Sequence, residues 1–410
     1  MNLHANDLLR GAMFLYSLYF VTMGVLPLLK GRKKIPHNEE KAHFVVLIAA
    51  RNEEKVIGAL LESLQMQEYD KEKYDVFVLP NHCTDTTAEI AKSYGAEVMN
   101  CPESVTGKGD VLKFAFAQLQ HRKEIDAYVI FDADNVADPQ FLSAMNDAYQ
   151  NGAEAAQGCR RGKNASDSWV SSSYEMFYSI QNTFFNSART NAGLSASLNG
   201  TGWMVRKELI DAEGFPTETL TEDIEYTAIC ALNAHPIVFV KDAVTYDEYP
   251  TEIAASCRQR LRWTFGDLSC MKRYTGRLLY TSAWDSSLSC LDMALIYLSP
   301  LFQTVSLGMG IVPVLLLVGN GRANSASSFL LRTACTSSLV SIAIALFACL
   351  YMRTSLRKNW KGLLTFPLFM ATWFPITLVC FFKRRCAWKP IVHQRALTLK
   401  EIRKDQKGYL

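Results

Sequence analysis

Four long apolar stretches lie at the two ends of the chain, and charged residues fill the segment between them. The stretches are Leu8–Leu29, Ser289–Val318, Phe329–Met352 and Leu363–Phe382. About 20 consecutive apolar residues are enough for a helix to span the hydrocarbon core of a bilayer. The pattern therefore predicts a membrane protein in which a soluble domain lies between an N-terminal transmembrane helix over residues 8–29 and a C-terminal transmembrane region over residues 289–382.

Basic residues beside these stretches predict the orientation of the chain. The basic segment Lys30–Lys34 follows the first stretch, so the positive-inside rule places the domain after it in the cytosol. Arg353–Lys361 and the basic tail over residues 383–410 are expected on the same side. Pro367 and Pro375 interrupt the last stretch, which is therefore either a re-entrant turn or a kinked span. We expect a multi-pass protein of the plasma membrane with two or three C-terminal spans.

The polar middle of the chain, residues 42–247, alternates apolar β-rich runs with helical patterns. Such alternation predicts a mostly parallel sheet covered by helices on both faces. In sheets of this kind, ligands bind at the carboxyl ends of the strands. The expected strands are His43–Ala50, Tyr74–Leu79, Glu97–Asn100 and Ala127–Phe131, and the expected helices are Asn52–Gln67, Thr86–Tyr94 and Asp110–His121.

Polar clusters follow several of these strands. Asp132 and Asp134 come directly after an apolar strand, and two carboxylates so placed suit a hard divalent cation such as Mg²⁺. The alternative is an ordinary solvated turn. The cluster Thr106–Asp110 leads into a predicted helix, so its backbone amides and the ammonium group of Lys108 can meet an anion. These clusters indicate a site for a phosphorylated ligand and a metal ion at one edge of the sheet.

Two later motifs make the pattern specific. Thr221-Glu222-Asp223 precedes an apolar helical run, and Gln259-Arg260-Leu261-Arg262-Trp263 lies shortly before the C-terminal apolar stretches. Taken in order, the clusters and motifs resemble the membrane-bound processive members of glycosyltransferase family 2, which include cellulose, chitin, hyaluronan and poly-N-acetylglucosamine synthases. The resemblance covers nearly the whole chain.

The resemblance implies a fold and an activity. The fold is an α/β nucleotide-sugar transferase domain with a Rossmann-like sheet of the GT-A type, followed by amphipathic interface helices over residues 251–288. The activity is inverting, processive transfer from a UDP-sugar, with Mg²⁺ or Mn²⁺ as cofactor, to a growing β-linked polysaccharide that is exported across the lipid bilayer. An accessory subunit is an open possibility.

The resemblance also implies roles for individual residues. Asp223 is the expected general base, because a sugar hydroxyl must lose its proton to a nearby carboxylate as it attacks. The alternative is that Glu222 and Asp223 only cap a helix. Asp132 and Asp134 are the expected metal ligands. The expected donor-binding residues are Ala50, Glu53, Asn81, Asp85, Lys108, Asp132, Arg260 and Arg262, and the expected acceptor-binding residues are Glu222, Asn199, Gly200, Thr201, Gln259 and Trp263.

Some of these assignments have competing explanations. Asn81 stands where many relatives carry an aspartate, although an amide can also bond the edge of a uracil ring. Arg260 and Arg262 would also suit a helix that meets lipid headgroups, and Trp263 would suit the aromatic belt of a membrane. The small net charge of +3 argues against nucleic-acid binding. Two other functions stay open, namely transfer of one sugar to a lipid and a membrane scaffold or transporter with an inactive transferase domain.

Overall fold

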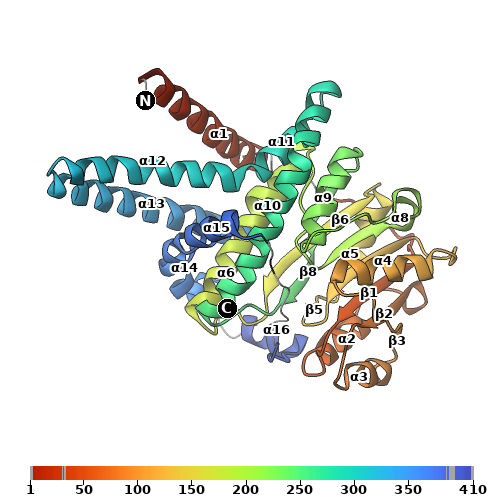
Figure 1. Ribbon diagram of the computed structural model, residues 1–410. Helices are drawn as coiled ribbons and strands as arrows, with labels where there is room; N and C mark the ends of the chain where they lie inside the picture. The colour runs from red at the N-terminus through yellow and green to blue at the C-terminus, as the bar shows by residue number, and fades with distance from the viewer. Residues whose placement is uncertain (1–2, 30, 32–33, 385, 387–392, 408–410) are drawn as a thin grey trace. The chain divides into compact units, whose positions relative to one another are not determined.

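The computed structural model describes residues 3–29, 31, 34–384, 386 and 393–407 (Figure 1). The chain divides into two compact units. The α/β unit comprises residues 32–164, 193–249 and 388–410, and the helical unit comprises residues 1–31, 165–192 and 250–387. The division differs from the predicted domain limits, because residues 165–192 group with the apolar helices and the end of the basic tail groups with the α/β unit.

The described residues of the α/β unit form one mixed sheet of eight strands in the order β3-β2-β1-β4-β7-β6-β8-β5. The strands are β1 (Phe44–Ala50), β2 (Tyr74–Pro80), β3 (Glu97–Val98), β4 (Ala127–Asp132), β5 (Val136–Ala137), β6 (Ala155–Gly162), β7 (Trp203–Arg206) and β8 (Ile237–Asp247). The helices are α2 (Ile57–Gln65), η1 (Lys71–Lys73), α3 (Thr87–Ser93), α4 (Lys108–Leu119), α5 (Phe141–Gln150), α8 (Lys207–Glu213), α9 (Glu222–Leu232) and α16 (Leu399–Lys407).

The pairing of the strands decides which ends share an edge. Strands β3, β2, β1 and β4 are parallel, as predicted, whereas β7 runs antiparallel to both β4 and β6. Because β6 and β8 are parallel to each other, β1, β4, β6 and β8 all point the same way. Their carboxyl ends therefore lie at one edge of the sheet, together with the loop that leads into β7.

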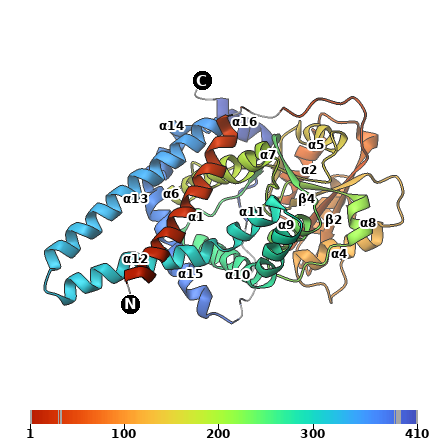
Figure 2. The same ribbon diagram turned by 90° about the horizontal axis from the view of Figure 1, so that it is seen from above.

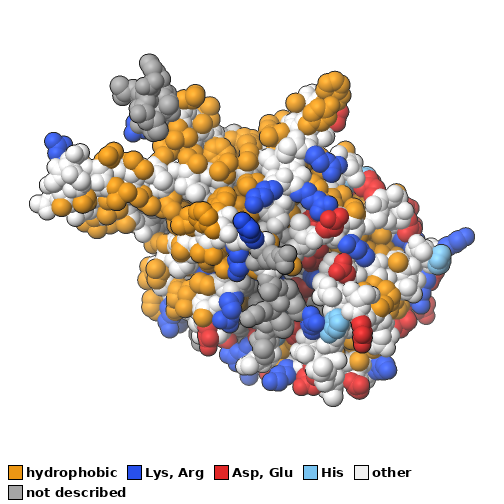
Figure 3. All heavy atoms as spheres, in the orientation of Figure 1, with side chains coloured by type: hydrophobic (Ala, Val, Ile, Leu, Met, Phe, Trp, Pro, Cys, Tyr) orange, Lys and Arg blue, Asp and Glu red, His pale blue; other side chains and the backbone are white. Residues whose placement is uncertain are grey.

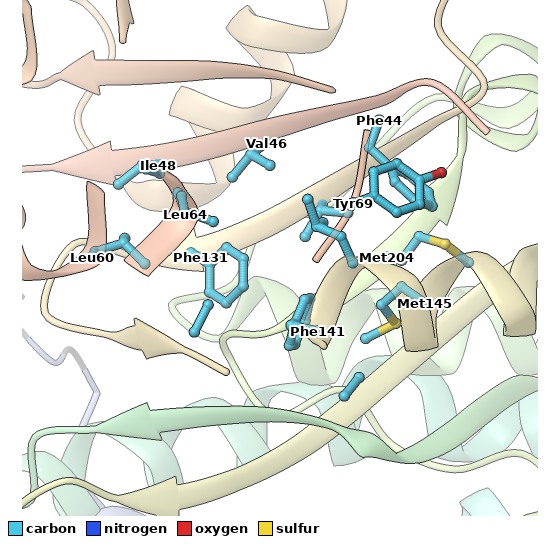
Figure 4. Packing of buried hydrophobic residues seen from close by; sticks show 14 of the residues in the cluster. Phe44, Val46, Ile48, Leu60, Leu64, Tyr69, Phe131, Phe141, Met145 and Met204 are labelled. Atoms are coloured by element: carbon cyan, nitrogen blue, oxygen red, sulfur yellow. The ribbon is translucent and has the colours of Figure 1, made fainter. Parts of the chain in front are cut away.

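The core explains why the first strands are apolar without interruption. Phe44, Val46 and Ile48 of β1 point into a cluster that also contains Phe131 and Met204, and none of these side chains is exposed (Figure 4). The intervening residues of β1 are buried as well. A central strand with helices on both faces has no polar side.

Two predicted elements of this unit differ from the observed ones. The helix expected from Asn52 begins at Ile57, because Asn52 has a left-handed backbone (φ 57°) and residues 52–56 form the loop after β1. Strand β3 is only two residues long and ends at Val98. The other predicted strands and helices agree with the structure to within about two residues, which is the usual uncertainty of element ends.

The helical unit contains the apolar stretches. Its helices are α1 (Leu3–Leu29), α6 (Trp169–Ile180), the π-helical segment η2 (Gln181–Ser187), α7 (Ala188–Ala192), α10 (Ile253–Trp284), α11 (Leu288–Tyr297), α12 (Ser299–Gly319), α13 (Ala323–Met352), α14 (Leu356–Ala371) and α15 (Trp373–Phe382). Helices α12 and α13 run side by side as a long hairpin (Figures 1 and 2). Hydrophobic side chains cover much of the surface of this hairpin (Figure 3).

Within the described residues, four helical segments are long and apolar enough to cross a membrane. They are Asp7–Leu29, Ser299–Gly319, Ala323–Met352 and Leu356–Phe382. The second is shorter than predicted, because the stretch that starts at Ser289 breaks at Leu298 into α11 and α12. The fourth breaks at Thr372. Pro375 lies in the first turn of α15. Backbone N–H groups of the first turn have no partner within the helix, so the missing N–H group of proline removes no helical hydrogen bond.

Candidate active site

The shared edge of the sheet brings together residues from four separate segments of the α/β unit. Asp132 is the last residue of β4, and Asp247 is the last residue of β8. The loop Asn199–Gly202 precedes β7 at the same edge, and Glu222 begins α9. From the sequence, only the resemblance predicted that Asp132, Glu222 and this loop lie near one another. The topology of the sheet gives the physical reason for this proximity.

Lys108 connects three of these segments. Its Nζ lies 2.5 Å from Asp132 Oδ1, 3.6 Å from Glu222 Oε1 and 2.6 Å from the carbonyl oxygen of Gly200. The ammonium group therefore offsets two carboxylates and fixes the backbone of the loop before β7. A cation at this position also offers positive charge to an anionic ligand at the edge.

Asp132 and Asp223 approach each other across Gly200. A Cβ atom added at Gly200 would lie 3.7 Å from Asp223 Oδ2, 4.0 Å from Asp132 Oδ2 and 3.6 Å from Arg160 Nη1. Gly200 has a φ of +84°, which side-chain-bearing residues rarely adopt. The absence of a side chain here leaves room between the two carboxylates for part of a ligand.

The carboxyl groups at this edge have raised pKa values. Burial raises the pKa of Glu222 to about 7 and also raises the pKa of Asp223, and in both cases Lys108 opposes the shift. Burial alone would lower the pKa of Lys108, but Asp132 and Glu222 raise it. Asp223 is thus a half-buried carboxyl group with an elevated pKa, which is the environment that makes a carboxylate an effective base near neutral pH.

The helix-capping alternative explains only part of this arrangement. Glu222 and Asp223 do lie in the first turn of α9, where negative charge is favourable. The cap residue Thr221 makes no side-chain hydrogen bond to the helix. Since Glu222 also contacts Lys108, and Asp223 faces Gly200, both side chains are directed toward the shared edge as well as toward their own helix.

Several buried side chains hold the loop Asn199–Gly202 in place. Gln157 accepts a hydrogen bond from the backbone N–H of Asn199 at 2.8 Å and donates to the carbonyl of Thr201 at 2.9 Å. The fully buried Thr201 hydroxyl accepts from the N–H of Asp132 at 2.9 Å and donates to Asn135. Thr201 therefore shapes the loop from within, and an acceptor contact stays a prediction for Asn199, Gly200 and Thr201.

An ion pair that the sequence analysis did not find supports the same loop. Arg160 Nε donates to Asp247 Oδ2 at 2.8 Å, and its Nη1 donates to the carbonyl of Asn199 at 2.7 Å. Burial raises the pKa of Asp247 to about 7, and Arg160 opposes that shift. No sequence signal indicated this pair, because nothing local shows that β6 and β8 are neighbours.

The predicted nucleotide-side residues lie in the loops after β1 and β2. These loops are tied together, since Asp85 accepts hydrogen bonds from the N–H of Glu54 at 3.1 Å and from the Thr87 hydroxyl at 2.6 Å. Although burial opposes it, these bonds lower the pKa of Asp85. Asn81 is buried and donates to the carbonyl of Val105 at 2.7 Å. Asp85 and Asn81 therefore have structural partners here, and their contacts with a nucleotide stay predictions.

Glu53 lies in the first of these loops, and Ala50 is the last residue of β1, directly before it. The Ala50 carbonyl accepts from the N–H of Asn81 at 2.9 Å, and the Glu53 carboxylate contacts His393 at 3.1 Å. His393 belongs to the C-terminal segment of the chain and was not among the predicted site residues. Although burial alone would lower the pKa of His393, the carboxylates of Asp134 and Glu53 raise it to about 10.

Asp132 and Asp134 can hold a divalent cation only together with other oxygen ligands. In the part of the chain that the structure describes, no group of three or more His, Cys, Asp or Glu side chains is arranged to hold a metal ion. Mg²⁺ and Mn²⁺ in such sites commonly bind one or two carboxylates and complete their coordination with substrate phosphate oxygens. The Asp132 side chain is 34% exposed, so its carboxylate is accessible to a ligand at the edge.

The residues Gln259, Arg260, Arg262 and Trp263 lie on α10 of the helical unit, as predicted for a helix. Arg260 is fully buried, with Nη1 donating to the carbonyl of Phe369 at 3.1 Å and its guanidinium over the rings of Phe369 and Trp373. This burial favours a role for Arg260 in fixing α10 within the unit. Donor or acceptor contacts of the four residues stay predictions.

A substitution at Gly200 tests whether the space between Asp132 and Asp223 is used. Gly200→Ala is expected to lower activity about 10²-fold, because the added methyl group lies between the two carboxylates and displaces the loop. The matched control is Gly214→Ala, which has a similar φ of +70° with no atom within 4 Å of the added Cβ. Equal loss of activity in both variants would mean that backbone strain, not the site, is responsible.

Comparison with known protein families gives one match to more than half of the chain. The family described as "Glycosyltransferase like family 2" matches residues 42–266. A beta-monoglucosyldiacylglycerol synthase of Nostoc is 27% identical over 248 residues, which cover 58% of this chain and 50% of that protein. A probable glycosyltransferase, YdaM of Bacillus subtilis, is 25% identical over 276 residues, which cover 62% of this chain and 63% of that protein.

The chain thus spans about half to somewhat under two thirds of the length of these relatives. Among solved structures, a mannosyltransferase of Pyrobaculum calidifontis in complex with GDP-Man and Mn²⁺ has a TM-score of 0.56 and 17% identity. The similarity covers 90% of this chain and 97% of that one. It confirms the predicted fold of the GT-A type with additional apolar helices. The sheet itself was predicted to be mostly parallel and is mixed, because β5 and β7 pair antiparallel with their neighbours.

Proposed function

This chain belongs to the glycosyltransferase-like family 2, and we propose that it transfers a single sugar from a uridine diphosphate sugar to a lipid acceptor. The observation that carries the proposal is the approach of Asp132 and Asp223 across Gly200, beside Lys108, at the carboxyl ends of the strands, where sheets of this kind bind ligands. The lipid acceptor is supported by the Nostoc relative, whose name describes synthesis of a glycosylated diacylglycerol. The four apolar helical segments also suit an enzyme that draws its acceptor from a bilayer.

The chemistry assigns one task to each side chain. Asp223 accepts the proton of the acceptor hydroxyl as that oxygen attacks the anomeric carbon of the donor, and the bond to the nucleoside diphosphate breaks. One displacement of this kind inverts the anomeric centre, so an α-linked donor gives a β-linked product. Lys108 holds the carbonyl of Gly200 and offsets the charge of Asp132 and Glu222.

A divalent cation fits the donor side of this arrangement. Asp132 and Asp134 would hold Mg²⁺ or Mn²⁺, and the ion would offset negative charge on the departing diphosphate. The solved mannosyltransferase complex contains Mn²⁺ and a nucleotide sugar, which supports this assignment. Cytosolic placement of the α/β unit, proposed from the basic residues beside the apolar stretches, would give the site access to nucleotide sugars.

A product assay tests the proposal. The purified full-length chain is supplied with radiolabelled UDP-glucose, Mn²⁺ and diacylglycerol in mixed micelles, and the lipids are separated by thin-layer chromatography. A lipid that carries one glucose is expected from the wild type and from Asp242→Asn, which alters an exposed strand residue. Asp132→Asn is expected to abolish the product. Absence of transfer from both UDP-glucose and UDP-N-acetylglucosamine, or transfer from GDP-mannose alone, would contradict the proposal.

Synthesis of a polysaccharide is the second candidate. The pentapeptide Gln259–Trp263 favours it, because this motif is a signature of the processive synthases that the sequence resembles. The comparisons support it less well than they support single transfer, since the reported relatives include a glycolipid synthase. The same assay separates the two candidates, because a polymer would remain at the origin of the plate and yield to a β-glucan hydrolase or chitinase.

A further inference from the structure

The end of the chain docks on the α/β unit, at the same side as the donor site. Helix α16 lies beside β5 and α2 (Figure 1). Its residues Leu399 and Ile402 are buried in a cluster with Ala59, Val136 and Tyr246. The helix begins with a capping interaction, because Glu401 accepts from the N–H of Thr398 at 2.8 Å. We call residues 393–404 the strap.

A carboxylate of the α/β unit holds the backbone of the strap. Glu248 follows β8, and its two carboxylate oxygens accept hydrogen bonds from the N–H groups of Gln394 and Arg395, each at 3.0 Å. Lys163 lies 3.2 Å from the same carboxylate, and its side chain is completely buried. On α16, Arg403 lies 3.2 Å from Asp138. The strap is thus fixed by apolar burial, backbone hydrogen bonds and an ion pair.

The docked strap brings an imidazole to the donor site. His393 Nδ1 lies 3.1 Å from both carboxylate oxygens of Glu53, and its Nε2 lies 3.9 Å from Asp134 Oδ2. Glu53 follows β1 and Asp134 follows β4, so the imidazole lies between two strand ends that the site uses. Without the strap, Glu53 and Asp134 would lose the neighbouring imidazole, and Glu248 would lose two backbone donors and keep Lys163 as its partner.

We propose that the strap is part of the donor site and that its docking and the binding of a nucleoside diphosphate stabilise each other. This inference rests on the proposed function, because it takes the edge with Asp132 and Asp134 as the donor site. The physical basis is the cover that the docked strap gives this edge: the imidazole of His393 lies against Glu53, and the N–H groups of Gln394 and Arg395 bind Glu248, so fewer unpaired carboxylate oxygens face a diphosphate. By linkage, the diphosphate must then favour the docked strap to the same degree.

The test measures binding without chemistry. UDP and, separately, GDP are titrated with Mn²⁺ into the full-length chain by calorimetry, for the wild type, His393→Ala, Ile402→Asp and the double variant. Ile402→Asp undocks the strap from a position on α16 that does not contact Glu53 or Asp134, and Lys400→Asp, at an exposed position of the same helix, is the matched control. Each single variant is expected to weaken binding about tenfold, within the usual range of such couplings.

The double variant is expected to bind no more weakly than the weaker-binding single variant, since both changes remove the same contribution. In the wild type, the same nucleotide is expected to slow hydrogen exchange at the Gln394 and Arg395 amides. Unchanged or tighter binding in His393→Ala and Ile402→Asp would overturn the inference while leaving the proposed function intact. Failure of the wild type to bind either nucleotide would overturn the proposed donor site as well.

Discussion

Asp223→Asn is expected to lower the rate of sugar transfer by about 10²–10⁴-fold, the usual contribution of a positioned general base. Asparagine keeps the shape of the side chain and its place beside Gly200 but cannot accept the proton of the acceptor hydroxyl. Binding of UDP and Mn²⁺ should be nearly unchanged, because Asp132 and Asp134 are retained. The measurements are kcat with the acceptor lipid and the affinity for UDP by calorimetry.

The pH dependence gives a second test of Asp223. Its pKa is raised, chiefly by burial, so the wild-type rate should increase as the pH rises through that value and the carboxyl group loses its proton. The residual rate of the Asp223→Asn variant should not show this increase with pH. Asp242→Asn is the control for a change of charge elsewhere in the unit. Full activity of Asp223→Asn across the pH range would remove Asp223 from the mechanism.

Lys108→Met is expected to lower kcat/KM about 10²-fold at pH 6 and by a smaller factor at pH 9. Lys108 lowers the pKa values of Glu222 and Asp223, which burial raises. Loss of its charge should therefore raise both pKa values further and move the rising limb of the pH profile to higher pH. The methionine side chain keeps most of the volume, so the fold should survive.

The matched control for Lys108→Met is Lys113→Met. Lys113 lies on the same helix, α4, where it pairs with Asp110 at 3.4 Å and donates to the carbonyl of Thr217 instead of meeting Asp132. The Lys113→Met variant should show the same dependence of activity on pH as the wild type. If Lys108→Met lowers activity by the same factor at every pH, Lys108 acts by holding the carbonyl of Gly200 and not by lowering the pKa values of Glu222 and Asp223.

Much of the proposed donor site could be predicted from the sequence because its determinants are local. Strand β1 is apolar at every position, and the β-rich runs that follow predict β2 and β4 with nearly correct limits. Asp132 and Asp134 are adjacent to β4 in the chain, so predicting the strand also predicts their edge of the sheet. The break at Leu298 between α11 and α12 was missed, since both sides of it are equally apolar.

The sequence by itself determined the apolar segments, the early strands and the acidic residues at the strand ends, because each depends on neighbours a few positions away. Tertiary structure decided the rest. Arg160 meets Asp247 because β6 and β8 pair in parallel, although the two residues are 87 positions apart. His393 meets Glu53 across 340 positions because Leu399 and Ile402 find an apolar surface on the α/β unit. Contacts of this kind depend on burial and strand pairing between distant segments, which no local pattern of residues encodes.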